Sequence, residues 1–170
     1  MTEIMQLMFE KHIWKGLAAA AIIGTSLIAC KKDDAPKKVL RYQTINLLDK
    51  NNVINGYITL AEATDSTFHI LMQINKSEMG KRYNFNLFRG NITSAPTDTL
   101  IKVASIESQT TGAAVMGRQL DVKTIKVDES TIRKFNYDSI IAVNGFARIS
   151  MIGSQGQDSA IALGNIGKNK

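Results

Sequence analysis

The amino-acid sequence predicts an all-β fold: one antiparallel β-sandwich of seven to eight strands that occupies residues 39–170. Apolar and polar residues alternate with a period of two through most of this region, and no long stretch has helical periodicity. Turn-forming residues recur between the alternating segments, which therefore have the length of short strands. A chain of 170 residues with 44% hydrophobic residues is long enough for one such sandwich and too short for a large multidomain enzyme.

A β-hairpin is the clearest element. In residues 67–74 (TFHILMQI) every second side chain, from Phe68 to Ile74, is apolar, as in a half-buried strand. Residues 56–63 (GYITLAEA) have the same period, and residues 64–66 (TDS) between the two runs suit a tight turn. The two runs are therefore expected to pair.

Six further segments are expected to be strands: 39–48, 83–89, 100–106, 113–122, 145–152 and 159–163. Turn signals lie at 49–52, 90–96 and 153–157. One segment departs from the pattern, because a single helical turn over residues 137–141 would place Tyr137 on the same side as Ile140 or Ile141. The glycines at 164 and 167 are expected in a β-turn or at a strand terminus.

The first 29 residues are expected to be a lipoprotein signal peptide that is cleaved off. Lys11, His12 and Lys15 form a basic region, and the apolar run 16–29 follows it. As a helix this run would cover about 21 Å, less than the roughly 30 Å of a membrane core, so it is too short for a stable span. The run leads into a motif that resembles the lipobox of bacterial lipoproteins: Leu27, Ile28, Ala29 and Cys30.

The lipobox resemblance implies that Cys30 is diacylated and becomes the mature N-terminus. Cys30 is the one cysteine of the chain, so its lipidation leaves no thiol for a disulfide. An ordinary signal peptide with a coincidental cysteine is the alternative, and translation could begin at Met1, Met5 or Met8. Residues 30–38 are expected to form a charged tether that is too polar to bury a core.

Lys32, Asp33 and Asp34 follow the cysteine closely and resemble the export signal of surface lipoproteins in Bacteroidetes-type bacteria. The resemblance implies an outer-membrane protein, anchored by its lipid, whose domain faces the cell exterior. A domain that faces the periplasm is the alternative.

Four phrases of the mature chain resemble the chordin-repeat (CHRD) domain in order and spacing: GYITLAEATDSTFHILMQI, YNFNLFRGN, YDSIIAVNGFARIS and AIALGNIG. The resemblance covers residues 56–167. It implies a Greek-key sandwich of the superoxide-dismutase-like or immunoglobulin-like type.

The sequence lacks the histidines that CHRD domains carry. Their positions fall on Asn86, Phe88 and Ser150, and the acidic residue of the family's terminal motif falls on Asn165. Amide, phenyl and hydroxyl groups cannot replace imidazole as ligands of zinc or copper. Neither a metal nor another cofactor is therefore expected.

No catalytic residue is predicted. His69 is the one histidine after residue 30, and a lone histidine gives neither a metal site nor a nucleophile–base pair. The carboxylates fall mostly at turns and strand ends, as solvated residues do. Lys81, Arg82 and Arg89 flank the aromatic run 83–88, and these basic residues are candidates for contact with a glycan or an anionic polymer.

Together these features predict a surface-exposed outer-membrane lipoprotein whose β-sandwich is a non-catalytic binding or structural module. An envelope enzyme of superoxide-dismutase-like or hydrolase type, and an assembly subunit of an envelope complex, are the alternatives. The expected partners are the membrane, through the N-terminal lipid, and a glycan or an envelope protein. Nucleic acid is not expected because the chain leaves the cytoplasm, and the net charge of +6 identifies no partner by itself.

Overall fold

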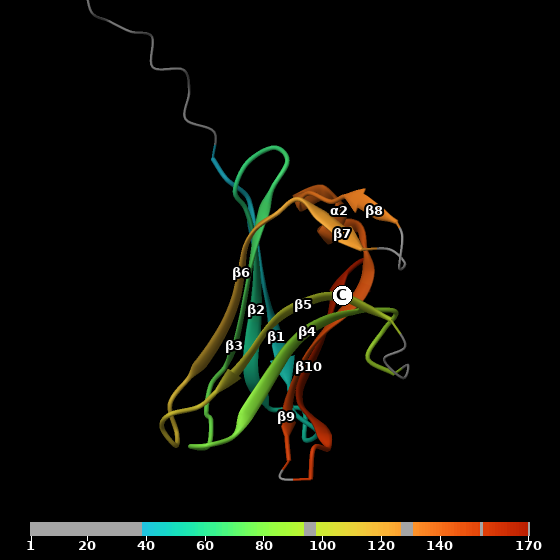
Figure 1. Cartoon of the computed structure of the whole chain (residues 1–170). Coiled ribbons are helices and arrows are strands. Elements are labelled where there is room, and N and C mark those ends of the chain that lie inside the picture. The colour runs from blue at the N-terminus through green and yellow to red at the C-terminus, as the bar shows by residue number, and fades with distance from the viewer. Residues whose placement is uncertain (1–38, 94–97, 127–130, 154, 170) are drawn as a thin grey trace, which may run out of the picture. The chain divides into compact units, whose positions relative to one another are not determined.

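The computed structural model describes residues 39–93, 98–126, 131–153 and 155–169 (Figure 1). The predicted signal peptide, the lipobox with Cys30, and the tether with Lys32, Asp33 and Asp34 lie outside the described residues. Contacts divide the chain into Met1–Val39 and Leu40–Lys170, and every described strand belongs to the second unit. Within the described residues, no helix has the length and apolar character that crossing a membrane requires.

The described residues form ten strands and one short helix, which confirms the all-β fold class. The strands of the main sheet are β1 (Tyr42–Leu48), β2 (Ile54–Glu62), β3 (Phe68–Ile74), β4 (Arg82–Arg89), β5 (Thr99–Glu107), β6 (Val115–Val122), β9 (Asn144–Ile152) and β10 (Asp158–Gly167). A two-stranded ribbon of β7 (Thr124–Lys126) and β8 (Ile132–Lys134), and then the helix α2 (Tyr137–Ala142), lie between β6 and β9 in the chain.

The eight main strands form one antiparallel sheet in the order β5-β4-β9-β10-β1-β2-β3-β6. The sheet curls until its outer strands, β5 and β6, touch, so it is barrel-like and nearly closed (Figure 1). Gly117 on β6 permits this contact, because a Cβ there would lie 2.9 Å from the Cβ of Ala104 on β5 and 2.9 Å from the ring of Phe85 on β4. The sequence predicts two packed sheets, whereas hydrogen bonds join all eight strands into one.

Alternate residues of the main strands fill the interior of the curled sheet. The predicted hairpin is confirmed: β2 pairs with β3 along its length, and Phe68, Ile70 and Met72 are fully buried. Phe85 of β4 and Ile149 of β9 belong to the same buried cluster. The core therefore lies between the β1-β2-β3-β6 part of the sheet and the β5-β4-β9-β10 part.

The helix α2 covers the same core. Asn136 begins it, since its Oδ1 accepts a hydrogen bond from the backbone N–H of Ser139 at 3.0 Å. Tyr137 and Ile140 are the buried residues of the helix, as the predicted helical turn requires. The ring of Phe135, just before the helix, lies 6.0 Å from that of Phe68 between centroids.

Two parts of the strand prediction are wrong. β10 continues to Gly167, past the predicted end at residue 163. The reason is that Gly164 serves a close contact between strands rather than a turn, because a Cβ there would lie 2.7 Å from the carbonyl oxygen of Asn46 on β1. The strands β7 and β8 are missing from the prediction, since three residues are too few to show an alternating pattern.

Candidate functional site

β1 and β10 are neighbours in the sheet that hardly pair. Within the described residues their register contains a single Cα pair, Leu48 with Leu163, whereas β1 and β2 pair at seven positions. Gly164 packs against the backbone of Asn46 and so holds the two strands together at one point. The sheet is therefore discontinuous along most of this seam.

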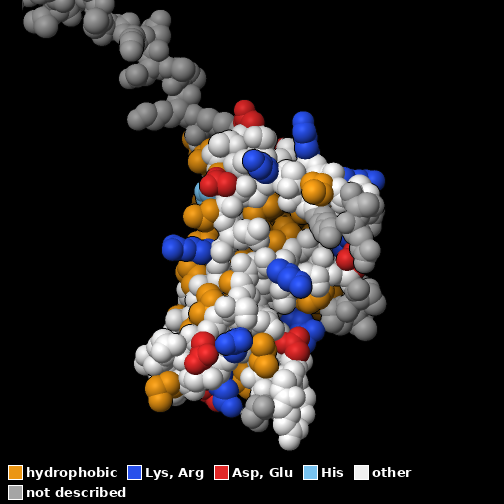
Figure 2. All heavy atoms as spheres, viewed as in Figure 1, with side chains coloured by type: hydrophobic (Ala, Val, Ile, Leu, Met, Phe, Trp, Pro, Cys, Tyr) orange, Lys and Arg blue, Asp and Glu red, His pale blue; other side chains and the backbone are white. Residues whose placement is uncertain are grey.

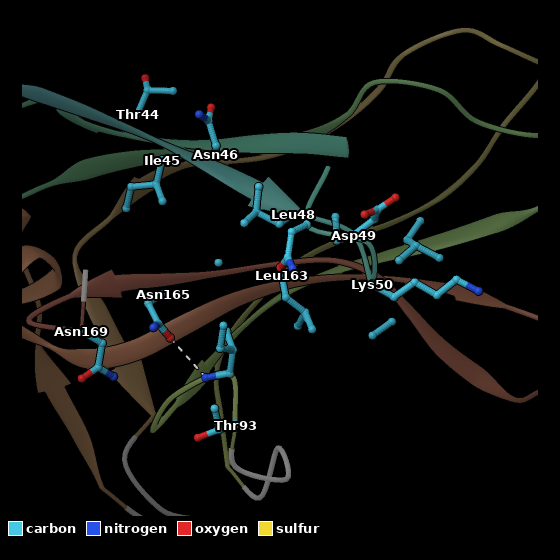
Figure 3. A pocket seen from close by; sticks show the side chains of 16 residues that line it. Thr44, Ile45, Asn46, Leu48, Asp49, Lys50, Thr93, Leu163, Asn165 and Asn169 are labelled. Atoms are coloured by element: carbon cyan, nitrogen blue, oxygen red, sulfur yellow. Dashed lines mark hydrogen bonds between the residues drawn. The ribbon is translucent and has the colours of Figure 1, made fainter. Parts of the chain in front are cut away.

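A cavity of about 820 Å³ lies along the seam, and we call it the seam groove (Figure 3). Ile45 of β1 and Ile161 of β10 are half-buried, pack against the core and form the floor of the groove. Leu48 and Leu163, the paired residues, also line it. The groove is therefore lined in part by apolar side chains.

β1 turns backbone hydrogen-bonding groups toward this groove. The N–H of Glu62 donates to the carbonyl oxygen of Arg41 at 2.7 Å, so these two residues are a hydrogen-bonded pair next to the β1–β2 ladder. Because hydrogen-bonded and non-hydrogen-bonded pairs alternate in an antiparallel ladder, Thr44 and Asn46 direct their N–H and C=O groups away from β2 and toward β10. The wall of the groove therefore offers backbone donors and acceptors.

Two asparagines form hydrogen bonds that hold the segment at residues 90–93 against the side of the groove opposite β1. Oδ1 of Asn165 accepts a hydrogen bond from the N–H of Ile92 at 3.1 Å, and Nδ2 of Asn169 donates to the carbonyl oxygen of Gly90 at 2.7 Å. Figure 3 shows both amides on the same side of the groove as Thr93. Each amide uses one of its two polar groups in these contacts, and within the described residues the other group makes no hydrogen bond.

The predicted turn after β1 closes one end of the groove. Oδ1 of Asp49 accepts hydrogen bonds from the N–H groups of Asn51 at 2.8 Å and Val53 at 2.9 Å, so this carboxylate is engaged by the turn. Asn52 adopts a positive φ of 60°, which asparagine tolerates in a turn. Lys50 lines the groove beside them. The turn interpretation of residues 49–52 is confirmed.

The positions that the CHRD resemblance aligns with histidines lie on one face of the sheet, but they do not pair with one another. Asn86 and Phe88 alternate on one face of β4, and Phe88 pairs with Phe146 of β9, which pairs with Asn165 of β10. The rings of Phe88 and Phe146 stack at 5.3 Å between centroids. Ser150 lies on the same face of β9. Within the described residues, no group of three or more His, Cys, Asp or Glu side chains could hold a metal ion.

The three basic residues predicted to contact a ligand are not brought to one place. Arg82 begins β4 and lies 3.7 Å from Glu107, with Lys81 just before it, whereas Arg89 ends the strand and lies 2.8 Å from Asp98. An eight-residue strand separates its ends by about 23 Å. Figure 2 shows the basic side chains of this side spread apart rather than gathered.

His69 is half-buried on the outer face of β3. Its Nδ1 accepts a hydrogen bond from the backbone N–H of Asp121 at 3.0 Å, and Asp121 has a positive φ of 52°. The histidine therefore supports a bulge in β6, where the β3–β6 register shifts between Phe68 and Ile70.

Sequence reasoning misses the seam groove because its parts are far apart in the chain. β1 supplies one wall, while Thr93, Asn165 and Asn169 supply the rim. The one available signal is the amide at Asn165, where CHRD domains have an acidic residue, and it identifies no groove without the strand order.

No family model matches the chain, and no curated protein matches it. Among solved structures, the crystal structure of an endonuclease/exonuclease/phosphatase from Beutenbergia cavernae DSM 12333 is similar to it with 9% sequence identity and a TM-score of 0.37. The match covers 74% of this chain and 27% of that chain, so this chain spans about a quarter of that protein's length. A likeness of this size carries no argument about fold or activity.

Proposed function

We propose that the protein is a surface-exposed outer-membrane lipoprotein whose barrel-like domain is a non-catalytic binding module. The observation that carries the binding role is the seam groove. Its volume of about 820 Å³ lies in the range of ligand sites, roughly 300–1,000 Å³. Its apolar floor and its backbone and amide rim can hold a ligand by contact area and by directed hydrogen bonds.

The chemistry of the groove favours binding over catalysis. Thr93, Asn165 and Asn169 have neutral side chains that do not exchange a proton at ordinary pH. The Asp49 carboxylate, which could act as a base, is engaged by two backbone N–H groups of its own turn. A glycan or an extended segment of an envelope protein would fit these groups.

A CHRD-like Greek-key arrangement is part of the proposal. The strands β4, β5 and β6 follow one another around the curled sheet, and β9 returns to lie beside β4. In a Greek key, three consecutive strands are neighbours and a fourth strand returns to lie beside the first. This order of strands supports the CHRD resemblance of residues 56–167.

The anchoring role rests on the sequence before the domain. The apolar run 16–29 and the lipobox residues lead directly into Cys30. Two or more acyl chains on one cysteine make membrane attachment stable, where a single chain is marginal. From Cys30 to Tyr42, where β1 begins, the extended chain would span at most about 40 Å, so the domain would stay close to the membrane.

Metabolic labelling with a palmitate analogue tests the anchor. We expect the wild-type protein to take up the label and to fractionate with membranes, and Cys30→Ser to do neither. Lys123→Ala, at an exposed position of the domain, is the control and should behave as wild type. Label that persists in Cys30→Ser would overturn the lipoprotein proposal.

Blocking the seam groove tests the binding role. Thr93→Trp adds a large ring at an exposed groove position, and Thr110→Trp adds the same ring at an exposed position outside it. Wild-type protein is expected to capture a glycan on a carbohydrate array or an envelope protein from membranes, and Thr93→Trp to lose that capture while Thr110→Trp keeps it. Equal capture by both variants would contradict a binding role for the groove.

A further inference from the structure

We propose that the outer face of β5, β4 and β9 holds a binding site for an oxyanion, a sulfate, phosphate or carboxylate group. The site is centred on Lys102 and Asn86, with Asn84, Ser105 and Ser150 beside them, and we call it the anion patch. It lies on other strands than the wall of the seam groove, and the inference does not depend on the lipid anchor.

The pairing of the strands assembles the anion patch. Asn86 pairs with Lys102 of β5, and Asn84 pairs with Ser105 of β5 and with Ser150 of β9. Residues that pair directly across antiparallel strands project from the same face. The β4 and β5 members of the set line a hollow of about 390 Å³. The hollow therefore collects amide, hydroxyl and ammonium groups from strands that are separate in sequence.

A β-bulge aims Lys102 into this set. Between Phe85 and Asn86 the partners on β5 change from Ala104 to Lys102, so Val103 is an extra residue. In a regular strand, residues 102 and 104 would project from the same face. With the bulge, Ala104 faces the interior near Gly117, whereas Lys102 is exposed beside Asn86. The irregularity thus adds a lysine to the face that also carries Arg82 and Arg148.

Unlike Arg82 and Arg148 on the same face, Lys102 has no carboxylate beside it among the described residues. Arg82 lies 3.7 Å from Glu107, and Arg148 lies 3.0 Å from Asp158, so each of these cations has a carboxylate. Within the described residues Lys102 has neither an ion pair nor a hydrogen bond. The hollow itself is lined by no carboxylate. An anion would therefore meet one uncompensated positive charge.

Polar side chains around Lys102 are not engaged by the rest of the described residues. The side-chain amides of Asn84 and Asn86 make no hydrogen bond with the described residues. Oγ of Ser150 and Nε of Arg148 are buried and have no hydrogen-bond partner among the described residues. Neither Ser150 nor Arg148 lines the hollow, so the polar groups there that a ligand oxygen could contact are those of Lys102, Asn84, Asn86 and Ser105.

The combination of charge and donors selects the ligand class. An oxyanion can accept hydrogen bonds from ammonium, amide N–H and hydroxyl groups at the same time, and charge strengthens each bond. A metal cation would be repelled by Lys102 and would find no carboxylate in the hollow. Because the site is open to solvent, added salt should weaken binding.

Calorimetric titration tests the proposal. The full-length protein is purified in the form in which it accumulates in cells, and it is kept in a nonionic detergent without sulfate or phosphate. One arm uses sodium sulfate, sodium phosphate and sodium acetate, and the other uses a heparin-derived hexasaccharide. We expect at least one inorganic anion to bind with a Kd of about 1 mM. Tighter binding of the hexasaccharide would identify a sulfate ester on a glycan as the source of the oxyanion, and equal binding would identify the free ion.

The variants locate the site. Lys102→Gln should weaken anion binding about tenfold or more, whereas Lys102→Arg should keep it within about threefold. Lys76→Gln, at another exposed lysine outside the hollow, is the matched control and should bind as wild type. Asn86→Ala is a second variant and should weaken binding about threefold. Melting curves of all variants show whether the fold is intact.

Two results would overturn the anion patch. One is the absence of binding by every probe at about 10 mM in the wild-type protein. The other is a failure to locate the site at Lys102, which would be shown by unchanged affinity in both Lys102→Gln and Asn86→Ala or by an equal loss in Lys76→Gln. Because the probes act on the domain itself, failure of the lipid labelling would leave these outcomes unaffected.

Discussion

Arg41 and Glu62 form a two-pronged ion pair at the entry to the first strand: Nε donates to Oε2 at 2.9 Å and Nη2 donates to Oε1 at 3.1 Å. Nη1 donates to Asp138 of α2 at 2.7 Å, and the guanidinium lies over the ring of Tyr137. The hydrogen bonds to Glu62 and Asp138 raise the pKa of Arg41 above its ordinary value, so it stays charged. One side chain therefore ties the start of β1 to β2 and α2.

Removing this arginine should destabilise the domain. The side chain of Glu62 is only 3% exposed, and Arg41→Met takes the guanidinium away from that buried carboxylate. Since Arg41 itself is half-exposed and water screens part of the interaction, we expect the melting temperature to fall by about 5 °C. The double variant Arg41→Met/Glu62→Leu should recover part of the loss, and the exposed Arg118→Met should lose little. Equal losses in the single and double variants would contradict the role of the pair.

Tyr137 should make the domain sensitive to alkaline pH. Burial raises the pKa of Tyr137 above its ordinary value, although the charge of Arg41 opposes the shift. A raised pKa means that the fold favours the protonated phenol. The contribution of the protonated phenol to the free energy of unfolding is present in full below about pH 10. It is lost as the pH rises through the pKa of Tyr137 in the folded protein.

Unfolding by urea at a series of pH values measures this effect. Tyr137→Phe should unfold with a free energy close to that of wild type at neutral pH and should lose less above about pH 10. Tyr42→Phe removes a hydroxyl from an exposed ring and should keep the wild-type dependence. A wild-type pH profile in Tyr137→Phe would rule out this tyrosine as the cause.

Gly117 should be required for the closure of the sheet. Gly117→Ala would bring a methyl group to 2.9 Å from Ala104 and from the ring of Phe85, so β5 and β6 would have to separate. We expect a loss of about 2 kcal/mol in the free energy of unfolding. Gly153→Ala is the matched control, because its nearest contact would be an ordinary 3.4 Å. If the two variants were equally stable, the close contact of β5 with β6 would be wrong.

The sequence predicts the strands in which apolar and polar residues alternate strictly. It does not predict the bulges and strand adjacencies that depart from this alternation. The hairpin of β2 and β3 follows from apolar side chains at every second position, because one face of each strand must be buried. Lys102 lies in a segment correctly predicted as a strand, but the bulge at Val103 decides which side it faces, and no local pattern reveals that. The seam groove depends on the adjacency of β1 and β10, which a single sequence does not contain.

Two buried serines should respond to alanine in opposite ways. Ser77 Oγ lies 2.6 Å from Ser108 Oγ and 2.7 Å from the carbonyl oxygen of Ala113, so Ser77→Ala should cost about 1–2 kcal/mol of unfolding free energy. Ser150 Oγ is buried with no partner among the described residues, so Ser150→Ala should be neutral or stabilising by about 1 kcal/mol. Urea unfolding of both variants measures the difference. A loss in Ser150→Ala as large as in Ser77→Ala would show that its hydroxyl has a partner.

Asp33 and Asp34 should direct the lipoprotein to the cell surface without affecting its anchor. Both lie in the tether beside Cys30, apart from the lipobox, so Asp33→Ala/Asp34→Ala should take up a palmitate analogue as wild type does. If the pair is read as an export signal, protease added to whole cells should digest the variant several-fold less than wild type. The matched double variant Asp33→Glu/Asp34→Glu keeps the charge and should be digested as wild type. If whole cells of the alanine variant were digested at the wild-type rate, the tether would carry no sorting information. If the alanine variant were digested slowly in lysed cells as well, the slower digestion would come from protease resistance of the domain.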